Sequence, residues 1–247
     1  MKRILTGITP SGYPHLGNYI GAIKPSLDLL DEKCESFLFI ADLHAVIKVS
    51  DPSRLAELSN AIAIAWLASG LDPNKTSFYR QSDIPEITEL AWLLSCITEK
   101  GLLNRAHAYK AAVDQNNESG KKEIDEGISL GLFSYPLLMA SDILTPNATH
   151  VPVGKDQQQH LEITRDIAEK FNNKYGKFFN VPEAVIQNEK TVLGTDGRKM
   201  SKSYNNIIPL LSTEKELKKS VMKIVTNSQE PGEKKEWKNN TLFSIYS

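Results

Sequence analysis

Two lysines near the C-terminal end of the sequence could hold an anion. Lys199 and Lys202 stand in the stretch GRKMSKSYNN, with Met200 between them and with Gly194 and Gly197 just upstream. The glycines predict a loop rather than a helix, and a merely solvated loop has no need of a lone methionine at its centre. Two ammonium groups at this spacing can bind a phosphate. A solvated basic loop is the alternative interpretation and the usual one for such runs.

A second anion site is indicated by the segment TPSGYPHLGNYIGA near the N-terminus. Gly12 and Gly17 allow the backbone to approach a ligand closely, and the helix predicted to follow offers free N–H groups to an anion. His15 and Asn18 lie three positions apart, so both side chains can point at one phosphate. An ordinary strand-to-helix turn explains these residues equally well. The segment lacks the GxGxxG pattern, and no Walker A sequence occurs, which argues against both of those nucleotide sites.

Polar residues also follow two apolar stretches later in the chain. Asp42 and His44 come directly after SFLFIA, and Gly154 and Asp156 follow THVPV. Gly154 permits close backbone approach, and Asp156 could accept hydrogen bonds from a ribose. A strand end with two solvated groups and a simple helix cap are the alternative interpretations.

Strands that alternate with helices must position these residues. Strands are predicted at 3–8, from 36 to about 42, at 76–82 and at 149–156, and helices at 18–33, 51–73, 86–100 and 157–176. This alternation predicts an α/β fold with a Rossmann-like parallel sheet and helices on both faces. Ligands bind at the carboxyl ends of the strands in such sheets, which is where the loops after Gly7, Ala41 and Val153 fall.

Local signals set the bounds of the clearest helices. Asp51 is expected to cap the second helix, with Pro52 in its first turn. Asp156 is expected to cap the last helix, with Gln159 as its reciprocal partner. The stretch DQNNESGKK, residues 114–122, predicts a polar exposed loop.

The composition bounds the class of protein. Of the 247 residues, 40% are hydrophobic and 24% are charged, with a formal net charge of -1. That length supports one large domain, or one domain and part of another, and a nucleic-acid partner would have to bind a local basic patch. Cys34 and Cys96 match no metal spacing and indicate free thiols in an intracellular protein. We expect no signal peptide, no membrane span and a cytoplasmic location, because no long apolar run occurs.

Several stretches together resemble one enzyme family. PHLGN resembles the HIGH element of class I aminoacyl-tRNA synthetases, and KMSKS is the second element of that class in its full form. TGITPSGYPHLGNYIGA, LFSYPLLMASDILTPNATHVPVGKDQQQHLEITRDIAEKFN and GRKMSKS resemble the bacterial-type tryptophanyl-tRNA synthetases over nearly the whole chain. The second stretch is the most specific, because tyrosyl enzymes share the fold but differ there.

The resemblance implies an activity and its partners. The carboxylate of L-tryptophan would attack the α-phosphate of ATP to give tryptophanyl-adenylate and pyrophosphate. Tryptophan would then pass to the 3′-terminal adenosine of tRNA(Trp). Mg²⁺ is expected on the phosphates, and no protein residue is assigned as a metal ligand. A homodimer is expected, as is typical of the family.

The resemblance also implies which residues form the site. The catalytic groups would be His15, Asn18, Lys199 and Lys202. The ATP-binding residues would be Thr9, Pro10, Ser11, Gly17, Asn18, Lys110, Gly154, Lys155, Asp156, Val192, Lys199, Met200, Ser201, Lys202 and Ser203. The tryptophan-binding residues would be Leu5, Gly7, His44, Tyr135, Met139, Asp142, Ile143, Val151, Val153 and Gln157.

The proposed amino-acid pocket agrees with the chemistry of indole. Indole is a large apolar body with one hydrogen-bond donor and no acceptor, so a selective site needs apolar walls and one acceptor. Asp142 stands in the apolar segment YPLLMASDI, where a carboxylate is costly unless something pairs with it. The resemblance implies that Asp142 accepts the indole N–H and that Tyr135 and Gln157 lie by the amino group. Core packing is the alternative for the apolar members.

Two positions depart from the family pattern. Thr9 stands where several relatives carry glutamine, and Leu5 where others carry phenylalanine. We expect residues 1–206 to form the catalytic domain and residues 207–247 to begin a helical anticodon-binding domain. Family members continue well past this point, so we expect an N-terminal catalytic fragment or an unusually short protein.

Three alternatives stay open. A tyrosyl-tRNA synthetase would share the fold and the loops. A nucleotidyltransferase of the same superfold would share the first turn but not a full KMSKS element. A paralogue that binds ATP or a partner without charging tRNA would lose tRNA binding while it keeps intact motifs.

Overall fold

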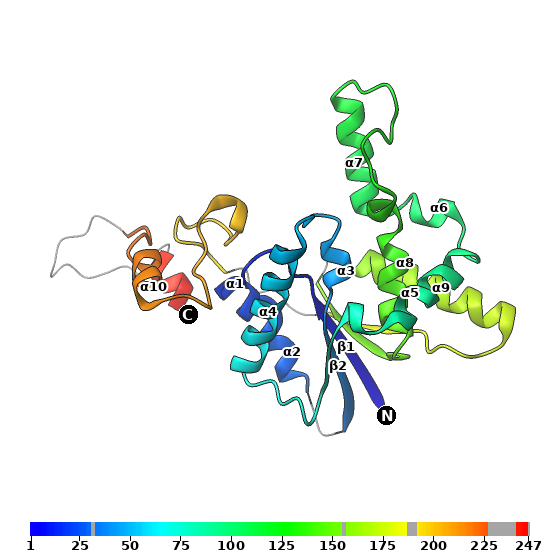
Figure 1. Ribbon diagram of the computed structural model, residues 1–247, viewed down its shortest axis with the longest axis horizontal. Helices are drawn as coiled ribbons and strands as arrows, with labels where there is room; N and C mark the ends of the chain where they lie inside the picture. The colour runs from blue at the N-terminus through cyan, green and yellow to red at the C-terminus, as the bar shows by residue number, and fades with distance from the viewer. Residues whose placement is uncertain (31–32, 155–156, 187–191, 227–240, 247) are drawn as a thin grey trace. The chain divides into compact units, whose positions relative to one another are not determined.

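The computed structural model describes residues 1–30, 33–154, 157–186, 192–226 and 241–246 (Figure 1). These residues form two compact units. Unit 1 is drawn from Met1–Ser11, Leu30–Ala56 and Asp72–Gln187, and unit 2 from Gly12–Leu29, Glu57–Leu71 and Asn188–Ser247. Each unit therefore brings together three separate stretches of chain.

Unit 1 is built on a five-stranded parallel sheet. Its strands are β1 (Lys2–Ile8), β2 (Cys34–Ile40), β3 (Ser77–Arg80), β4 (His150–Val153) and β5 (Glu183–Ile186), in the spatial order β3-β2-β1-β4-β5. β1 and β2 lie side by side, with Gly7 opposite Phe39 (Figure 1). This order is that of the Rossmann-type folds, so the predicted fold class is confirmed. The pattern did not predict β5, which is short and mostly exposed.

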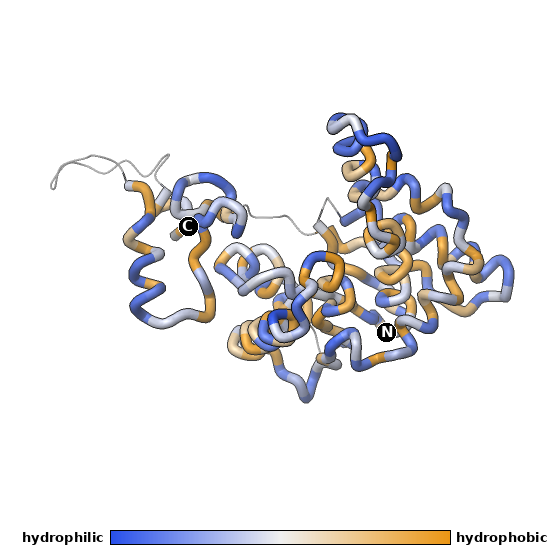
Figure 2. Tube along the Cα trace, turned by 45° about the horizontal axis from the view of Figure 1, so that its top comes forward, coloured by the Kyte–Doolittle hydropathy of each residue, from blue (hydrophilic) through white to orange (hydrophobic). Residues whose placement is uncertain are grey.

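The helices of unit 1 pack through apolar faces. They are α3 (Asp42–Ala45), α5 (Pro85–Ser95), α6 (Lys100–Leu103), α7 (His107–Glu118), α8 (Leu130–Leu144) and α9 (Gln158–Tyr175), with a 3₁₀ turn η2 (Gln81–Asp83). Helix α4 (Pro52–Ala68) begins in unit 1 and continues in unit 2. One buried cluster joins α5, α8 and α9 through Leu94, Leu144 and Ile167. Hydrophobic and hydrophilic stretches alternate along these helices (Figure 2), as expected for helices with one buried face.

Helix α7 corrects the prediction of a loop over residues 114–122. The helix continues to Glu118, and the exposed turn begins only there. Asn116 is buried and donates through Nδ2 to the backbone oxygens of Ile124 and Glu126, each at 3.0 Å. Figure 1 shows α7 extending away from α5, α8 and α9, and Figure 2 shows that its outer end is mainly hydrophilic. Polar residues therefore stabilise this projection, although their composition is typical of a loop.

Two further predictions about the helices of unit 1 need correction. The single helix predicted over 86–100 is interrupted between α5 and α6. Gln159 does not act as a reciprocal cap, because its side chain accepts from the His107 N–H (2.9 Å) and donates to the Arg105 carbonyl (2.8 Å). Gln159 thus holds the base of α7. Asp156, its expected partner, lies outside the described residues.

Unit 2 contains the first loop of the sequence and the segments that follow residue 191. Its elements are α1 (Leu16–Asn18), the π-helical η1 (Tyr19–Ile23), α2 (Lys24–Asp28), the 3₁₀ turn η4 (Lys202–Tyr204), α10 (Glu214–Val221) and α11 (Thr241–Tyr246). The helix predicted over 18–33 contains a wide π-helical turn just before Pro25, in which the Lys24 N–H donates to the Tyr19 carbonyl. Pro25 has no N–H of its own to continue the usual ladder.

Helices α10 and α11 follow the boundary predicted between residues 206 and 207, which stays a prediction. Across the described ranges, no helix has both the length and the apolar character needed to cross a membrane.

Candidate functional site

A buried carboxylate on α8 is the central polar group of unit 1. Asp142 is 1% exposed, and its two oxygens accept hydrogen bonds from His44 Nε2 (2.8 Å) and Gln81 Nε2 (2.7 Å). We call Asp142, His44 and Gln81 the aspartate cluster. Burial raises the pKa of Asp142, and the two hydrogen bonds act in the opposite direction. Each carboxylate oxygen can accept more than one bond, so the cluster keeps acceptor capacity for a further donor.

Gln81 is a member of this cluster that the sequence does not single out. Its side chain is fully buried, and Oε1 accepts from the backbone N–H groups of Leu43 (3.0 Å) and His44 (3.4 Å). Gln81 directly follows β3. The rule that ligands lie at the carboxyl ends of parallel strands applies to this strand as well, and it would have identified the residue.

Most residues assigned to the indole ring meet in a second hydrophobic cluster of unit 1. Leu5, Ile143, Val151 and Val153 are buried there, and Met139 packs against them. Leu5 is 2% exposed and fills its place in the cluster. Apolar side chains from β1, α8 and β4 therefore form one continuous buried cluster.

An aromatic pair in this cluster was not predicted. The Phe39 ring stacks on Tyr79, with ring centres 5.7 Å apart. A Cβ atom at Gly7 would lie 2.4 Å from Phe39 Cε1, so only glycine allows the ring to rest against β1. Burial, and then the negative charge of Asp142, raise the pKa of Tyr79. Phe39 and Tyr79 thus pack in the same cluster as the predicted residues.

The two residues assigned to the amino group of tryptophan share a histidine. The Tyr135 hydroxyl donates to His160 Nε2, and His160 Nδ1 donates to Gln157 Oε1 at 3.1 Å. One neutral tautomer of His160 satisfies both contacts. Burial raises the pKa of Tyr135. His160 is buried on α9 and was not identified from the sequence.

The remaining residues of unit 1 that were assigned to ATP are Thr9, Pro10, Ser11, Lys110, Gly154, Lys155 and Asp156. The first three form the turn after β1, in which the Ser11 N–H donates to the Thr9 carbonyl (2.8 Å). Lys110 is exposed on the projecting α7. The Gly154 carbonyl accepts from the Gln157 N–H (3.1 Å), and Lys155 and Asp156 lie outside the described residues.

His15 and Asn18 lie together at the start of α1 in unit 2. Asn18 Oδ1 accepts from the His15 N–H at 3.0 Å, which caps the helix start. Burial, and then the positive charge of Lys202, lower the pKa of His15 from 6.5 to about 4. Within the described residues, His15 Nδ1 is buried and has no hydrogen-bond partner. A neutral imidazole with an unsatisfied nitrogen is suited to a polar ligand.

Lys199 and Lys202, the two lysines of the GRKMSKSYNN stretch, have different surroundings in unit 2. We call residues 192–206 the lysine loop. Lys202 is exposed but lies close to Gly12, since a Cβ atom there would lie 2.7 Å from Lys202 Nζ. Burial lowers the pKa of Lys202. Lys199 is exposed and forms an antiparallel bridge with Leu193. Only Lys202 is therefore held against the first turn.

Other residues of the lysine loop fix its shape. Met200 is 6% exposed, and its sulfur accepts from the Gly17 N–H at 3.3 Å. Its own N–H donates to the Val192 carbonyl (2.8 Å). Ser201 caps η4 by accepting from the Ser203 N–H (3.3 Å). Met200 thus anchors the loop to the first turn.

Asn206 organises the lysine loop from within. It is 2% exposed, accepts from the Ser201 N–H (2.8 Å), and donates to Asp196 Oδ1 (2.7 Å) and the Lys199 carbonyl (3.2 Å). A Cβ atom at Gly194 would lie 2.2 Å from Asn206 Nδ2. Gly194 is therefore needed for the close packing of Asn206. The sequence motif includes Asn206 but assigns it no role.

Backbone hydrogen bonds join the first turn to the segment after the lysine loop. The Leu16 N–H donates to the Ile208 carbonyl (2.9 Å), and the Leu210 N–H donates to the Pro14 carbonyl (3.2 Å). His15 forms an antiparallel bridge with Pro209 between them. The two anion-binding segments predicted separately are thus parts of one structural unit.

The described residues contain no group of three or more histidine, cysteine or acidic side chains that could hold a metal ion. A magnesium ion bound to nucleotide phosphates needs no such cluster, because water and phosphate oxygens supply most of its ligands.

Comparisons with known proteins point to one family. The family model described as "tRNA synthetases class I (W and Y)" matches residues 1–246. The chain is 55% identical over 247 residues to tryptophan--tRNA ligase of Neisseria meningitidis, and this match covers 99% of the chain and 74% of the relative. It is 56% identical to the tryptophan--tRNA ligase of Xanthomonas campestris, of which it covers 57%. The chain thus spans between about half and three quarters of the length of these relatives.

A solved structure agrees with this result. The tryptophanyl-tRNA synthetase of Campylobacter jejuni, complexed with ADP and tryptophan, matches with a TM-score of 0.88 and 48% identity. The match covers 98% of this chain and 73% of that protein.

Proposed function

Because the chain belongs to the class I tRNA synthetases of the tryptophan and tyrosine group, and within it to the tryptophan–tRNA ligases, we propose that it activates L-tryptophan with ATP and passes the amino acid to tRNA(Trp). The carboxylate oxygen of tryptophan attacks the α-phosphorus, the bond to the β-phosphate oxygen breaks, and pyrophosphate leaves. No enzyme-bound covalent intermediate is needed, so the rate enhancement comes from positioning the substrates and from stabilising the charge of the transition state.

The buried Asp142 carboxylate is the observation that best supports tryptophan as the amino acid. It accepts from His44 and Gln81 and retains capacity for the single N–H of indole. An analogue that lacks a ring donor leaves the buried acceptor without its partner, which gives strong rejection. Leu5, Met139, Ile143, Val151 and Val153, with the Phe39–Tyr79 pair, are the proposed walls. Tyr135 and Gln157, joined through His160, are the proposed contacts of the α-amino group.

In unit 2, His15, Asn18, Lys199 and Lys202 are the proposed phosphate contacts. His15 is neutral at pH 7 because burial and Lys202 lower its pKa, so it acts as a hydrogen-bonding group rather than as a cation. Lys202 has lost part of its hydration, and a phosphate oxygen would compensate for this loss. Lys199 is exposed, so its ammonium group can move to contact the pyrophosphate as negative charge develops there.

The other assignments rest on family membership. ATP and Mg²⁺ are proposed as substrate and as an ion that enters on the phosphates, and tRNA(Trp) as the acceptor of the second step. A homodimer and a cytoplasmic location are proposed on the same ground. Thr9, Pro10, Ser11, Lys110, Gly154, Lys155, Asp156, Val192, Met200, Ser201 and Ser203 remain proposed ATP contacts.

Replacement of the lysines tests the proposed chemistry. In Lys199→Ala and Lys202→Ala, adenylate formation should fall by about a hundredfold or more, while tryptophan affinity stays within about threefold of the wild type. Lys219→Ala on α10 is the matched control, because it removes an exposed lysine outside the lysine loop. Wild-type rates in both loop variants would contradict the phosphate-binding role.

A further inference from the structure

Gln81 is placed so that its side-chain amide can take only one orientation. Its Oε1 accepts from two backbone N–H groups, those of Leu43 and His44, and its Nε2 faces Asp142 Oδ1 at 2.7 Å. If the amide were flipped, its NH₂ group would face the backbone N–H groups of Leu43 and His44, and its oxygen would face the Asp142 carboxylate. Neither pairing can form a hydrogen bond. The surroundings therefore require Gln81 to donate to Asp142.

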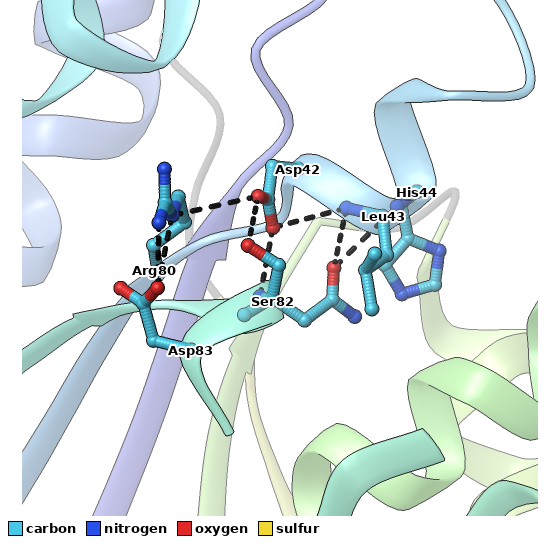
Figure 3. A network of polar contacts seen from close by, with 7 residues as sticks. Asp42, Leu43, His44, Arg80, Ser82 and Asp83 are labelled. Atoms are coloured by element: carbon cyan, nitrogen blue, oxygen red, sulfur yellow. Dashed lines mark hydrogen bonds and ion pairs between the residues drawn. The ribbon is translucent and has the colours of Figure 1, made fainter. Parts of the chain in front are cut away.

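The backbone around Gln81 is also fixed. Asp42 accepts from the N–H (3.0 Å) and the hydroxyl (2.5 Å) of Ser82, and from the Leu43 N–H (3.1 Å). Arg80 Nε lies 3.8 Å from Asp42, and Arg80 also pairs with Asp83. Figure 3 shows this network between the turn after β3 and the start of α3. Both neighbours of Gln81 in the sequence are thus tied to the network.

The same side chain connects both donors of the aspartate cluster. Gln81 donates to one oxygen of Asp142 and accepts from the backbone of His44, whose ring donates to the other oxygen. Loss of the Gln81 amide would leave the carboxylate held by the His44 ring alone. It would also remove the acceptor of the His44 N–H, whereas the Leu43 N–H would keep Asp42 as its acceptor. The group proposed to read indole would then lose its fixed direction.

We propose that Gln81 is a positioning residue for amino-acid selection, which holds the Asp142 carboxylate in the orientation that accepts the indole N–H. The inference rests on the proposed function, because it needs Asp142 to be the indole acceptor. Gln81 itself does not touch the substrate in this account. Gln81 should affect how strongly the protein prefers a ligand with a ring N–H over one without it, and it should not affect the phosphate chemistry.

Two variants separate a missing donor from a damaged fold. Gln81→Met keeps the length and removes the donor and the acceptor. Gln81→Glu keeps the acceptor for Leu43 and His44 and sets a second carboxyl group against Asp142. Two carboxyl groups in a buried site at this distance share one proton, so at pH 6 the introduced side chain still donates to Asp142. The second variant therefore restores the function that the first one lacks.

The measured quantity is the ratio of two dissociation constants, obtained by calorimetry at pH 6 without ATP. The ligands are L-tryptophan and 3-(benzothiophen-3-yl)alanine, in which sulfur replaces the ring N–H. The amino and carboxyl groups are the same in both, so their contributions cancel in the ratio. Asn116→Asp is the matched control, because it replaces a buried hydrogen-bonding amide of unit 1 in the α7 hairpin.

The wild type and Asn116→Asp should prefer tryptophan to the same extent. In Gln81→Met the preference should fall by about tenfold, as expected when a hydrogen bond to a charged group is lost. In Gln81→Glu it should stay within about threefold of the wild type, and this variant decides alone if Gln81→Met does not fold. An unchanged preference in Gln81→Met, or an equal loss in Gln81→Glu, would overturn the positioning role. A wild type without preference would instead contradict the proposed role of Asp142.

Discussion

Asn206 should control the order of the lysine loop, although it carries none of the proposed chemistry. Asn206→Ala removes one acceptor and one donor group from a side chain that is almost fully buried. The bonds to the Ser201 N–H and the Lys199 carbonyl lie on either side of the Met200 anchor. We expect the variant to fold and to hold the lysine loop less firmly.

The size of the effect follows from these two bonds. Each net hydrogen bond contributes about 0.5–1.5 kcal/mol, so local opening of the loop becomes easier by about 1–3 kcal/mol. This corresponds to roughly a fivefold to 150-fold loss of amide protection over the loop, because about 1.4 kcal/mol is a factor of ten. The Asn206 bond is also the largest cause that lowers the pKa of Asp196 to about 2. In the variant this pKa should rise towards 3.8, the ordinary value.

Two measurements test the prediction. Hydrogen exchange by mass spectrometry should show faster exchange over residues 194–206, and the maximal rate of tryptophan-dependent pyrophosphate exchange should fall by about tenfold or more. Asn172→Ala is the matched control, since Asn172 makes three hydrogen bonds to the turn after α9 in unit 1. The control should leave the lysine loop unchanged. Wild-type protection and rate in Asn206→Ala would refute the reasoning.

Three further predictions concern stability and binding. Since burial and Lys202 lower the pKa of His15 from 6.5 to about 4, the unfolded state binds more protons between these values, and the free energy of unfolding should rise with pH across that window by at most about 3 kcal/mol. Urea titrations at pH values from 4 to 7 measure the free energy of unfolding, and its rise with pH should be smaller in His15→Gln than in the wild type. Gly7→Ala should cost about 1–3 kcal/mol in thermal unfolding, because its Cβ meets the Phe39 ring; an unchanged melting temperature would contradict this contact. Asp142→Asn should weaken tryptophan binding by about tenfold or more, which equilibrium titration measures, and equal affinity would remove the proposed acceptor.

Local rules predict the elements whose causes lie in neighbouring residues. Asp51 accepts from the Ser53 N–H at 3.0 Å, and α4 begins at Pro52 as expected from the capping signal. Leu58 and Trp66, two turns apart on this helix, are both buried and form part of its inner face. Such features depend on a few adjacent side chains, so the sequence is sufficient to place them.

The same rules fail where a polar residue bonds to a distant part of the chain. Gln81 and Asp142 are 61 positions apart, and Gln159 and His107 are 52 apart. A pattern of neighbouring residues contains no information about such pairs. Asn116 illustrates the consequence. The composition of residues 114–122 is typical of a loop, but the buried Asn116 side chain donates to the carbonyls of Ile124 and Glu126 and so stabilises the end of α7.

The candidate site divides in the same way. Residues in contiguous motifs, such as His15 and Lys202, could be named from their order and spacing. The supporting roles of His160, outside the motifs, and of Asn206, inside one, became visible only through their contacts. Motifs thus identify the groups proposed to touch the substrate, and the fold identifies the groups that hold them.

The central claim is that this chain activates tryptophan. The most direct measurement is pyrophosphate exchange into ATP by the 247-residue chain, with tryptophan, tyrosine and phenylalanine in parallel. We expect exchange with tryptophan and a far lower rate with the other two, because only indole presents the expected apolar body and ring donor. Exchange that depends on tyrosine, or an absence of exchange together with no tryptophan binding, would contradict it.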